Sequence, residues 1–198
     1  FQFRPQPGAH DLSQFRKCYV DSGLIADAKK DGVTTLLLAP DGLPDSMKEI
    51  QSGGGLACKA GEEKNYAVLL ADFIKQLQDE TGVRLDVTGL QNEPNDHERF
   101  SPQQIVAVVK HLRRELDTRG LQSVQIIAPE HASADGVLNE QVDALKSDAA
   151  AWSSLDGIAS HSYNMAASGE IARRLTGPDN RNLKEYWMTE ASDNGPEA

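Results

Sequence analysis

Apolar residues along the chain alternate between short runs of strand length and longer stretches with helical spacing. The strand-like runs are residues 34–39, 85–90, 124–128, 156–160 and 184–189, and residues 1–4 alternate like the tail of a further strand. The run at 34–39 is continuous rather than alternating, which is typical of a strand covered on both faces. The pattern therefore predicts six strands.

Helices are predicted between the strands, each with an apolar stripe on one side. They cover residues 22–30, 63–80, 101–119, 135–151 and 167–175. The first is expected to bury Leu24, Ile25 and Ala28. The third has the most complete start signal, because Ser101 is a good N-cap and Gln104 stands at the capping-box position.

The long loop at residues 40–62 contains Gly53-Gly54-Gly55. A glycine triplet can cradle a phosphate, but no Lys-Ser or Lys-Thr pair follows this one into a helix, so a P-loop is excluded. We expect a mobile loop at this position.

Strands that alternate with helices predict an α/β fold with a parallel sheet and right-handed crossovers. Such a sheet is either open and doubly wound or closed into a (β/α)8 TIM barrel. No GxGxxG motif follows the first strand, which argues against a dinucleotide-binding sheet. Polar residues instead follow the C-terminal ends of several strands, where a barrel builds its active site: Asp41, Glu93, His131, His161 and Glu190. We expect one domain of the barrel type over residues 1–198.

Two of these residues are glutamates placed where a buried strand gives way to a polar loop. Glu93 follows the run at 85–90, and Glu190 closes the run at 184–189. A single glutamate is most often a solvated surface carboxylate, because an unpaired one is costly to bury. Two carboxylates that face each other, however, form the general acid and the nucleophile of a glycosidase.

These motifs resemble the (β/α)8 glycoside hydrolases of clan A. In that clan the fourth strand ends in Asn-Glu-Pro and the seventh in a nucleophilic glutamate, matched here by Asn92-Glu93-Pro94 and by Glu190. With residues 1–4 as strand two, the run at 85–90 is strand four and the run at 184–189 is strand seven. Both motifs therefore fall on the same strands of the barrel as in the clan.

Within the clan the chain is most similar to glycoside hydrolase family 30. That family carries a proline-rich stretch with Met-Lys after strand three, Gln-Asn-Glu-Pro on strand four and Ala-x-His-x-Tyr on strand six. The matching residues are 40–48, 91–94 and 159–163. The aromatic residue that members often place after strand three is absent, and Asp41 and Asp45 occupy that loop, so no particular sugar is implied.

The resemblance implies a retaining β-glycoside hydrolase without cofactor or metal, with Glu93 as the acid/base and Glu190 as the nucleophile. It also implies that Asn92 hydrogen-bonds the sugar 2-OH and that Tyr163 holds the Glu190 carboxylate. Further candidate substrate contacts are His161, Asp41, Trp187 and Arg4, the last matched to the arginine that ends strand two in the clan.

Two of the candidates have a strong structural alternative. Trp187 is either a sugar platform or part of the core, and the core is favoured because buried aromatic residues are common in such strands. His131 is interpreted as a packed or solvent-facing histidine rather than a site residue.

Two other function classes compete with the glycosidase. A metal-dependent hydrolase barrel would draw its ligands from His97, His131, His161, Asp41 and Asp96, but no HxH or HExxH spacing occurs. A non-catalytic carbohydrate-binding or structural fragment is the third class. Metal content separates the first alternative from the glycosidase, and turnover of a chromogenic β-glycoside separates the second.

Composition and charge limit the partners and the cellular location that can be expected. The 198 residues carry a formal charge of −10, which argues against nucleic acid as a partner because phosphate binding needs a basic face. No apolar run approaches the ~20 residues of a membrane helix, and no signal peptide opens the chain, although the numbering can begin after one. Cys18 and Cys58 fit either a disulfide or two free thiols. We expect β-linked oligo- or polysaccharides as partners and a secreted protein rather than a cytoplasmic one.

The strand count predicts an incomplete barrel, with strands two to seven present and strands one and eight missing. A closed barrel needs eight strands, so open edges and part of the packed interior would face water. Such edges promote association. We therefore expect a homo-oligomer formed through the exposed barrel edges, and weak catalysis unless the missing strands are restored.

Overall fold

Five parallel strands form the central sheet in the computed structural model, which describes residues 8–94, 98–163, 168–177 and 183–191. They are β1 (Leu37–Leu38), β4 (Val87–Thr88), β6 (Gln125–His131), β7 (Gly157–His161) and β8 (Glu185–Glu190). The strand order in space is β1-β4-β6-β7-β8, and every pairing is parallel. These are five of the six predicted strands, and the sixth, at residues 1–4, lies outside the described residues.

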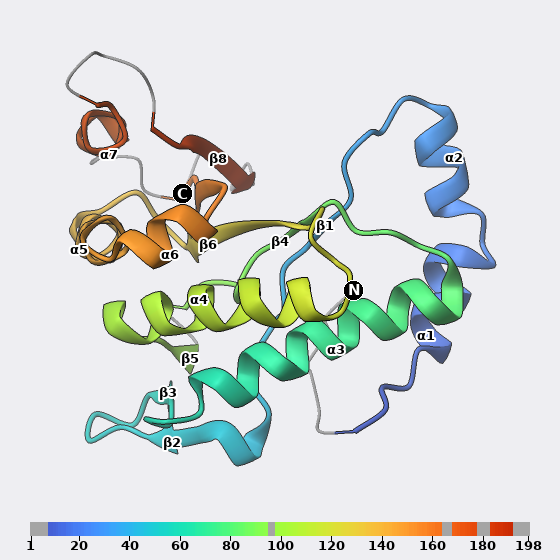
Figure 1. Cartoon of the computed structure of the whole chain (residues 1–198), viewed down its shortest axis with the longest axis horizontal. Coiled ribbons are helices and arrows are strands. Elements are labelled where there is room, and N and C mark those ends of the chain that lie inside the picture. Colours follow the sequence, from blue (N-terminus) through green and yellow to red (C-terminus); the bar gives the residue numbers. More distant parts are fainter. Residues whose placement is uncertain (1–7, 95–97, 164–167, 178–182, 192–198) are drawn as a thin grey trace, which may run out of the picture.

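Helices connect successive strands of the sheet. They are α3 (Glu63–Thr81), α4 (Pro102–Thr118), α5 (Gly136–Ser147), α6 (Ala149–Ser154) and α7 (Ser168–Arg174), of which α3 and α4 run side by side (Figure 1). Ahead of β1 come α1 (Ser13–Phe15), a π-helical turn (Arg16–Val20) and α2 (Leu24–Lys30).

Alternate residues of the strands face two different apolar clusters. Ile126 and Ile158 belong to the large core that also holds the buried faces of α3, α4 and α5. Their neighbours Ile127 and Ala159 point the other way and form a small separate cluster with Trp187. A doubly wound sheet carries helices on both faces. Here the helices pack on one face of the described strands, and the strands follow one another in sequence order. This arrangement is half of a barrel.

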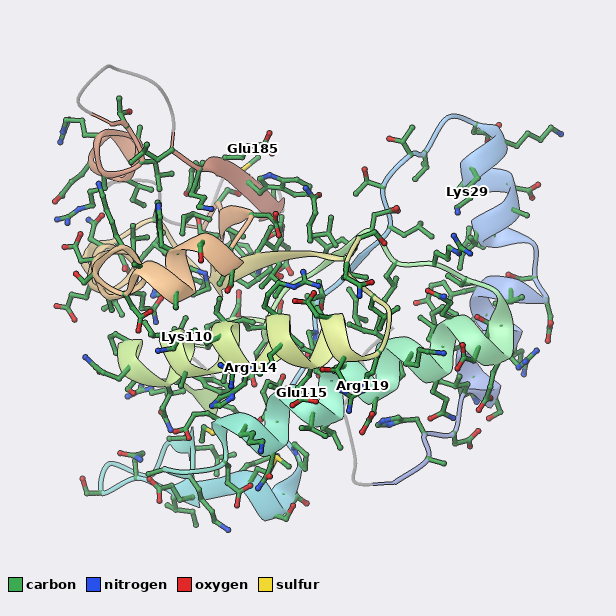
Figure 2. The ribbon with its side chains drawn as sticks, in the orientation of Figure 1. Lys29, Lys110, Arg114, Glu115, Arg119 and Glu185 are labelled. Atoms are coloured by element: carbon green, nitrogen blue, oxygen red, sulfur yellow. The ribbon has the colours of Figure 1, made fainter. Side chains whose placement is uncertain are left out.

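Local sequence signals predict the two long helices well. α4 begins with the expected capping box, in which the side chains of Ser101 and Gln104 each bond the other residue's backbone N–H. α3 ends at Gly82, whose φ of 73° is left-handed. The apolar stripe of α4 is buried, while polar side chains including Lys110 and Arg114 lie on its other faces (Figure 2). Among the described residues, no helix has the length and apolarity needed to cross a bilayer.

The long loop predicted at residues 40–62 instead contains two strands of a small sheet. After a 3-10 turn (Asp45–Met47), β2 (Lys48–Ile50) pairs antiparallel with β3 (Leu56–Cys58), and β3 pairs in parallel with β5 (Glu98–Arg99). The glycine triplet lies in the hairpin turn, where Gly54 has a φ of 84°. The strands were not predicted because β5, which pairs with β3, comes from a distant part of the chain, and no local pattern indicates that pairing.

Three further predictions need correction. β1 is the edge of the described sheet and Leu37 is 37% exposed, so this strand is not covered on both faces. The predicted buried face of α2 is partly open, with Leu24 52% exposed. The helix predicted at 135–151 is two helices that meet at Asp148. Its carboxylate accepts hydrogen bonds from the backbone N–H groups of Ala150 and Ala151, and so starts α6 as an N-cap.

The two cysteines are free thiols, so no disulfide joins them. Cys18 is exposed, whereas Cys58 is buried, and burial raises the pKa of the Cys58 thiol to about 12. The sequence left both states open, and the structure has the unpaired one.

Candidate active site

Side chains from three strands meet at the C-terminal edge of the sheet. His161 and Glu190 are the last residues of β7 and β8, and Glu93 follows shortly after β4. Because the strands are parallel, their C-terminal ends lie at the same edge. The pairing of β7 with β8 shifts between Ser160 and His161, so that His161 comes opposite Glu190. This irregularity brings the two side chains next to each other.

His161 lies between the two glutamates. Its Nδ1 is 2.9 Å from Oε1 of Glu93, and its Nε2 is 3.9 Å from Oε2 of Glu190. One carboxylate oxygen of each glutamate and a ring nitrogen of His161 all lie within 4.8 Å of one another. The two carboxylates are therefore close enough for both to contact one bound group.

Tyr163 contacts the outer glutamate. Its hydroxyl donates a hydrogen bond to Oε1 of Glu190, which is the contact expected from the sequence, and its ring meets His161 edge-on at a centroid distance of 5.9 Å. The Glu190 side chain is 46% exposed, whereas that of Glu93 is 12% exposed. The site is thus open on the Glu190 side and enclosed on the Glu93 side.

Neighbouring strands hold the backbone around Glu93. The N–H of Asn92 donates to the carbonyl of Pro40 at 2.7 Å, and the N–H of Glu93 donates to the carbonyl of Glu130 at 3.1 Å. Glu93 has a φ of 48°, in the left-handed region that residues with a side chain rarely adopt. A conformation of this kind persists where the surroundings fix it, and here bonds to the β1 loop and to β6 do so.

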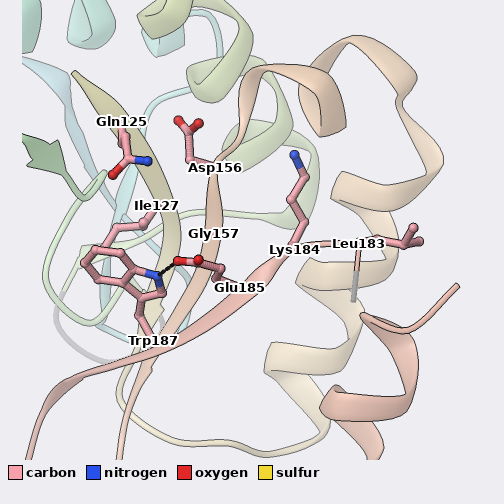
Figure 3. Close-up of a pocket in the computed structure, with 8 residues that line it drawn as sticks. All are labelled: Gln125, Ile127, Asp156, Gly157, Leu183, Lys184, Glu185 and Trp187. Atoms are coloured by element: carbon pink, nitrogen blue, oxygen red, sulfur yellow. Dashed lines mark hydrogen bonds between the residues drawn. The ribbon is translucent and has the colours of Figure 1, made fainter. Parts of the chain in front are cut away.

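Trp187 lies away from this edge of the sheet. It lines a cavity of about 490 Å³ at the beginnings of β6, β7 and β8, where its indole N–H donates to Glu185 at 2.9 Å (Figure 3). The other lining residues are Gln125, Ile127, Asp156, Gly157, Leu183 and Lys184. Trp187 also packs with Ala159 in the inner apolar cluster. Trp187 is thus partly buried against this cluster, and it does not join the group around His161.

The remaining candidates take different positions. Asp41 is half-buried in the loop after β1, and among the described residues its side chain makes no hydrogen bond to another candidate. Arg4 lies outside the described residues. His131 is a packed histidine, since it is fully buried and its Nδ1 accepts the N–H of Ser133 at 3.1 Å. Burial is also the main reason why the pKa of His131 is lowered.

Glu130 is a further carboxyl at the site and is not among the site residues predicted from the sequence. It lies in β6 beside His131 and is 1% exposed. Burial raises the pKa of its carboxyl, the neighbouring Thr189 hydroxyl and the His161 ring lower it, and Glu190 raises it. The one available signal is an acid at the end of an apolar run, which is the same signal that Glu93 gives.

Glu93, His161 and Glu190 are also placed so that together they could hold a metal ion. One imidazole nitrogen with two carboxylate oxygens suits several divalent cations. His161 is already hydrogen-bonded to Glu93, so the group needs no ion to hold it together. Of the ligands considered for a metal-dependent hydrolase, His97 and Asp96 lie outside the described residues, and His131 and Asp41 are not part of this group.

Comparison with known proteins gives matches in structure. No family model matches the sequence, and no curated protein matches it. A GH30 endoxylanase from Clostridium papyrosolvens C71 aligns over 95% of this chain with a TM-score of 0.66 and 22% identity. SrfJ from Salmonella typhimurium aligns over 98% with a TM-score of 0.73 and 19% identity. An endo-β1,6-glucanase aligns over 93% with a TM-score of 0.73 and 20% identity.

The resemblance to glycoside hydrolase family 30 that the motifs indicate is therefore confirmed at the level of the fold. The chain covers 48% of the endoxylanase, 46% of SrfJ and 44% of the glucanase, so it spans about half the length of these proteins. At such identities the likeness shows the fold, and the activity has to be argued from the site.

Proposed function

We propose that this chain carries the catalytic centre of a retaining β-glycoside hydrolase. The observation behind the proposal is the pair of glutamates after β4 and at the end of β8, with one oxygen of each within 4.8 Å. Retaining glycosidases need carboxyl groups about 5–5.5 Å apart, whereas inverting ones keep them about 6.5–9.5 Å apart to admit a water. A closest distance within 4.8 Å between their oxygens is compatible with the shorter of these separations.

Each glutamate has a distinct role in this mechanism. Glu190 attacks the anomeric carbon while the glycosidic C–O bond breaks and Glu93 gives its proton to the leaving oxygen. A water then attacks the same carbon, Glu93 takes its proton, and the bond to Glu190 breaks. Tyr163, which donates to Glu190, aligns the nucleophile. Asn92 is proposed to bind the 2-OH of the sugar.

The proposed substrates are β-linked oligo- or polysaccharides. Two matched structures are named as an endoxylanase and an endo-β1,6-glucanase, so β-xylosides and β-glucosides are the first to test. A polymeric substrate suits a protein outside the cytosol. A further match, at a TM-score of 0.68 and 14% identity, is named a conserved exported protein from Bacteroides fragilis.

Replacing the nucleophile tests the proposal most directly. Glu190→Ala should abolish turnover of aryl β-glycosides and leave the circular dichroism spectrum unchanged. Added azide should then restore a product of inverted configuration, because a small anion fills the space of the carboxylate. Azide rescue with retained configuration, or activity in the variant without azide, contradicts the assignment of Glu190.

Replacing the acid should give a different signature. Glu93→Gln should lower kcat/KM by about 10²–10⁴-fold for glycosides with a poor leaving group, the usual contribution of a general acid. It should spare 2,4-dinitrophenyl glycosides, whose leaving group needs no proton. Equal loss on both substrates contradicts the role of Glu93.

If turnover is too slow to follow, a single-turnover measurement can still test the proposal. A 2-deoxy-2-fluoro β-glycoside with a good leaving group slows the second step, so the sugar should remain attached to the peptide that contains Glu190, as read by mass spectrometry. Binding of β-linked oligosaccharides without any label would support the non-catalytic carbohydrate-binding alternative instead. Absence of both binding and label would reject the proposed function.

A further inference from the structure

Two strained residues are coupled at the ends of β4 and β6. Glu93 has a φ of 48° and Glu130 a φ of 68°, and these are the non-glycine residues with positive φ in the described part of the chain. The N–H of Glu93 donates to the carbonyl of Glu130 at 3.1 Å. The unusual backbone of one residue is therefore tied to that of the other.

Glu130 is also the irregular residue of β6. In the pairing of β6 with β7, Pro129 lies opposite Ala159 and His131 opposite Ser160, so Glu130 is left without a partner in β7. A bulge of this kind changes the direction of the extra residue's side chain and backbone. Here the Glu130 carbonyl accepts the N–H of Glu93, which follows β4.

The side chain of Glu130 is wedged against β4. A Cβ added to Gly89 would lie 2.8 Å from Oε2 of Glu130 and 3.0 Å from its carboxyl carbon, so any larger residue at this position would displace the Glu130 side chain. The charged and polar groups that face the carboxyl are Thr189 and Glu190 from β8 and His161 from β7. Among the described residues, its Oε1 has no hydrogen-bond partner.

We propose that Glu130 is a positioning residue for Glu93. The Glu130 carboxyl packs against Gly89 and holds the bulged backbone of Glu130 in place. The Glu130 carbonyl in turn holds the backbone that orients the Glu93 side chain. This inference rests on the proposed glycosidase function, in which Glu93 is the acid. A carboxyl buried without a full set of partners costs stability. Leucine lacks the planar polar end that lies near Thr189 and His161, so it would not hold the bulge in the same way. A purely structural role gives no reason for an acid here.

Leaving-group dependence tests the proposal, because it reports on the acid and not on general damage to the fold. Glu130→Leu and Gly89→Ala should each lower kcat/KM for phenyl β-glycosides at least about tenfold, part of the range of a general acid. For 2,4-dinitrophenyl β-glycosides, both should stay within about twofold of wild type. Glu130→Gln keeps the shape of the side chain and should restore both values to within about threefold. Rates are taken with enzyme in excess, so that slow turnover remains measurable.

The controls separate this inference from the proposed function. Asn139→Ala removes another buried polar side chain, far from Glu93 in the chain and on α5, and should affect both substrates equally. Equal losses for Glu130→Leu on both substrates, or no loss, overturn the positioning role. If Glu130→Leu does not fold, Glu130→Asp, which no longer reaches fully over Gly89, takes its place with the same expectation. If Glu93→Gln itself shows no dependence on the leaving group, the acid assignment fails, whatever Glu130 does.

Discussion

At the scale of single residues, Glu130 links the site to the stability of the fold. The residue is 1% exposed, and burial raises the pKa of its carboxyl above the ordinary value of 4.5. An acid whose pKa is raised on folding binds its proton more tightly in the folded state than in the unfolded state. Stability therefore falls as pH rises from the ordinary pKa through the raised one, and the loss persists at higher pH.

We accordingly expect Glu130→Gln to change the pH dependence of stability. Relative to the variant, the wild type should lose at least about 1 kcal/mol of unfolding free energy between pH 4 and pH 8, the order of cost of a buried polar group without a full set of partners. Urea denaturation of both proteins at the two pH values measures the difference. Parallel pH profiles would show that the carboxyl ionises as easily in the folded protein as in the unfolded one.

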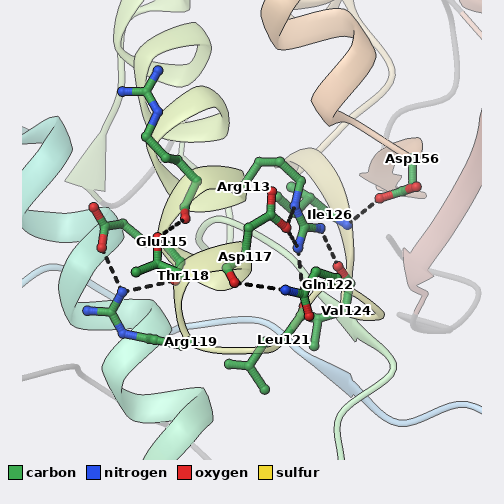
Figure 4. Close-up of polar contacts among 11 residues, drawn as sticks. Arg113, Glu115, Asp117, Thr118, Arg119, Leu121, Gln122, Val124, Ile126 and Asp156 are labelled. Atoms are coloured by element: carbon green, nitrogen blue, oxygen red, sulfur yellow. Dashed lines mark hydrogen bonds and ion pairs between the residues drawn. The ribbon is translucent and has the colours of Figure 1, made fainter.

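At the scale of elements, the side chain of Arg113 links the end of α4 to the turn that precedes β6. Arg113 donates to the carbonyl of Val124 at 2.7 Å and to that of Leu121 at 3.1 Å, and it also bonds Asp117 (Figure 4). Its side chain is 18% exposed. These bonds satisfy carbonyl groups of the turn that delivers β6, the strand that carries Glu130.

Arg113→Lys should therefore destabilise the fold although it keeps the charge. A lysine ammonium is a point donor and cannot span both carbonyls, so we expect a loss of about 1–2 kcal/mol. The matched control is Arg114→Lys at the adjacent, exposed position, which should change stability by less than about 0.5 kcal/mol. Urea midpoints of the two variants give the comparison, and equal midpoints would mean that the carbonyl contacts add nothing.

At the scale of the whole molecule, the two outer strands of the described sheet carry apolar side chains in water. Leu37 on β1 is 37% exposed and Met188 on β8 is 57% exposed. Exposed strand edges with apolar side chains favour association. The inner face is also open at the cavity beside Trp187.

We therefore expect the chain to form a dimer or a larger species through these edges. Light scattering should give at least twice the monomer mass. Leu37→Lys and Met188→Lys should shift the protein toward the monomer because a lysine on an edge strand opposes pairing. Val137→Lys, at an apolar position on α5 that is 48% exposed, should leave the mass unchanged. A monomeric wild type would contradict the prediction.

The sequence by itself determined the parts of this protein that depend on neighbouring residues. The capping box of Ser101 and Gln104 fixed the start of α4, and the apolar stripes fixed the buried faces of α3 and α4. The β-α alternation fixed the parallel sheet, and therefore placed Glu93 and Glu190 at one edge of it. These signals act within a few residues or follow from chain connectivity, so they can be recognised without knowledge of the fold.

Only the tertiary structure decided how distant segments meet. The pairing of β3 with β5 turned an expected loop into a sheet, and the edge position of β1 exposed Leu37. The bulge in β6 wedged Glu130 over Gly89, and the shift between β7 and β8 set the spacing of the two glutamates around His161. Each of these depends on side chains packing across a long sequence separation. Apolar periodicity specifies which face of an element is buried, but not which partner covers it.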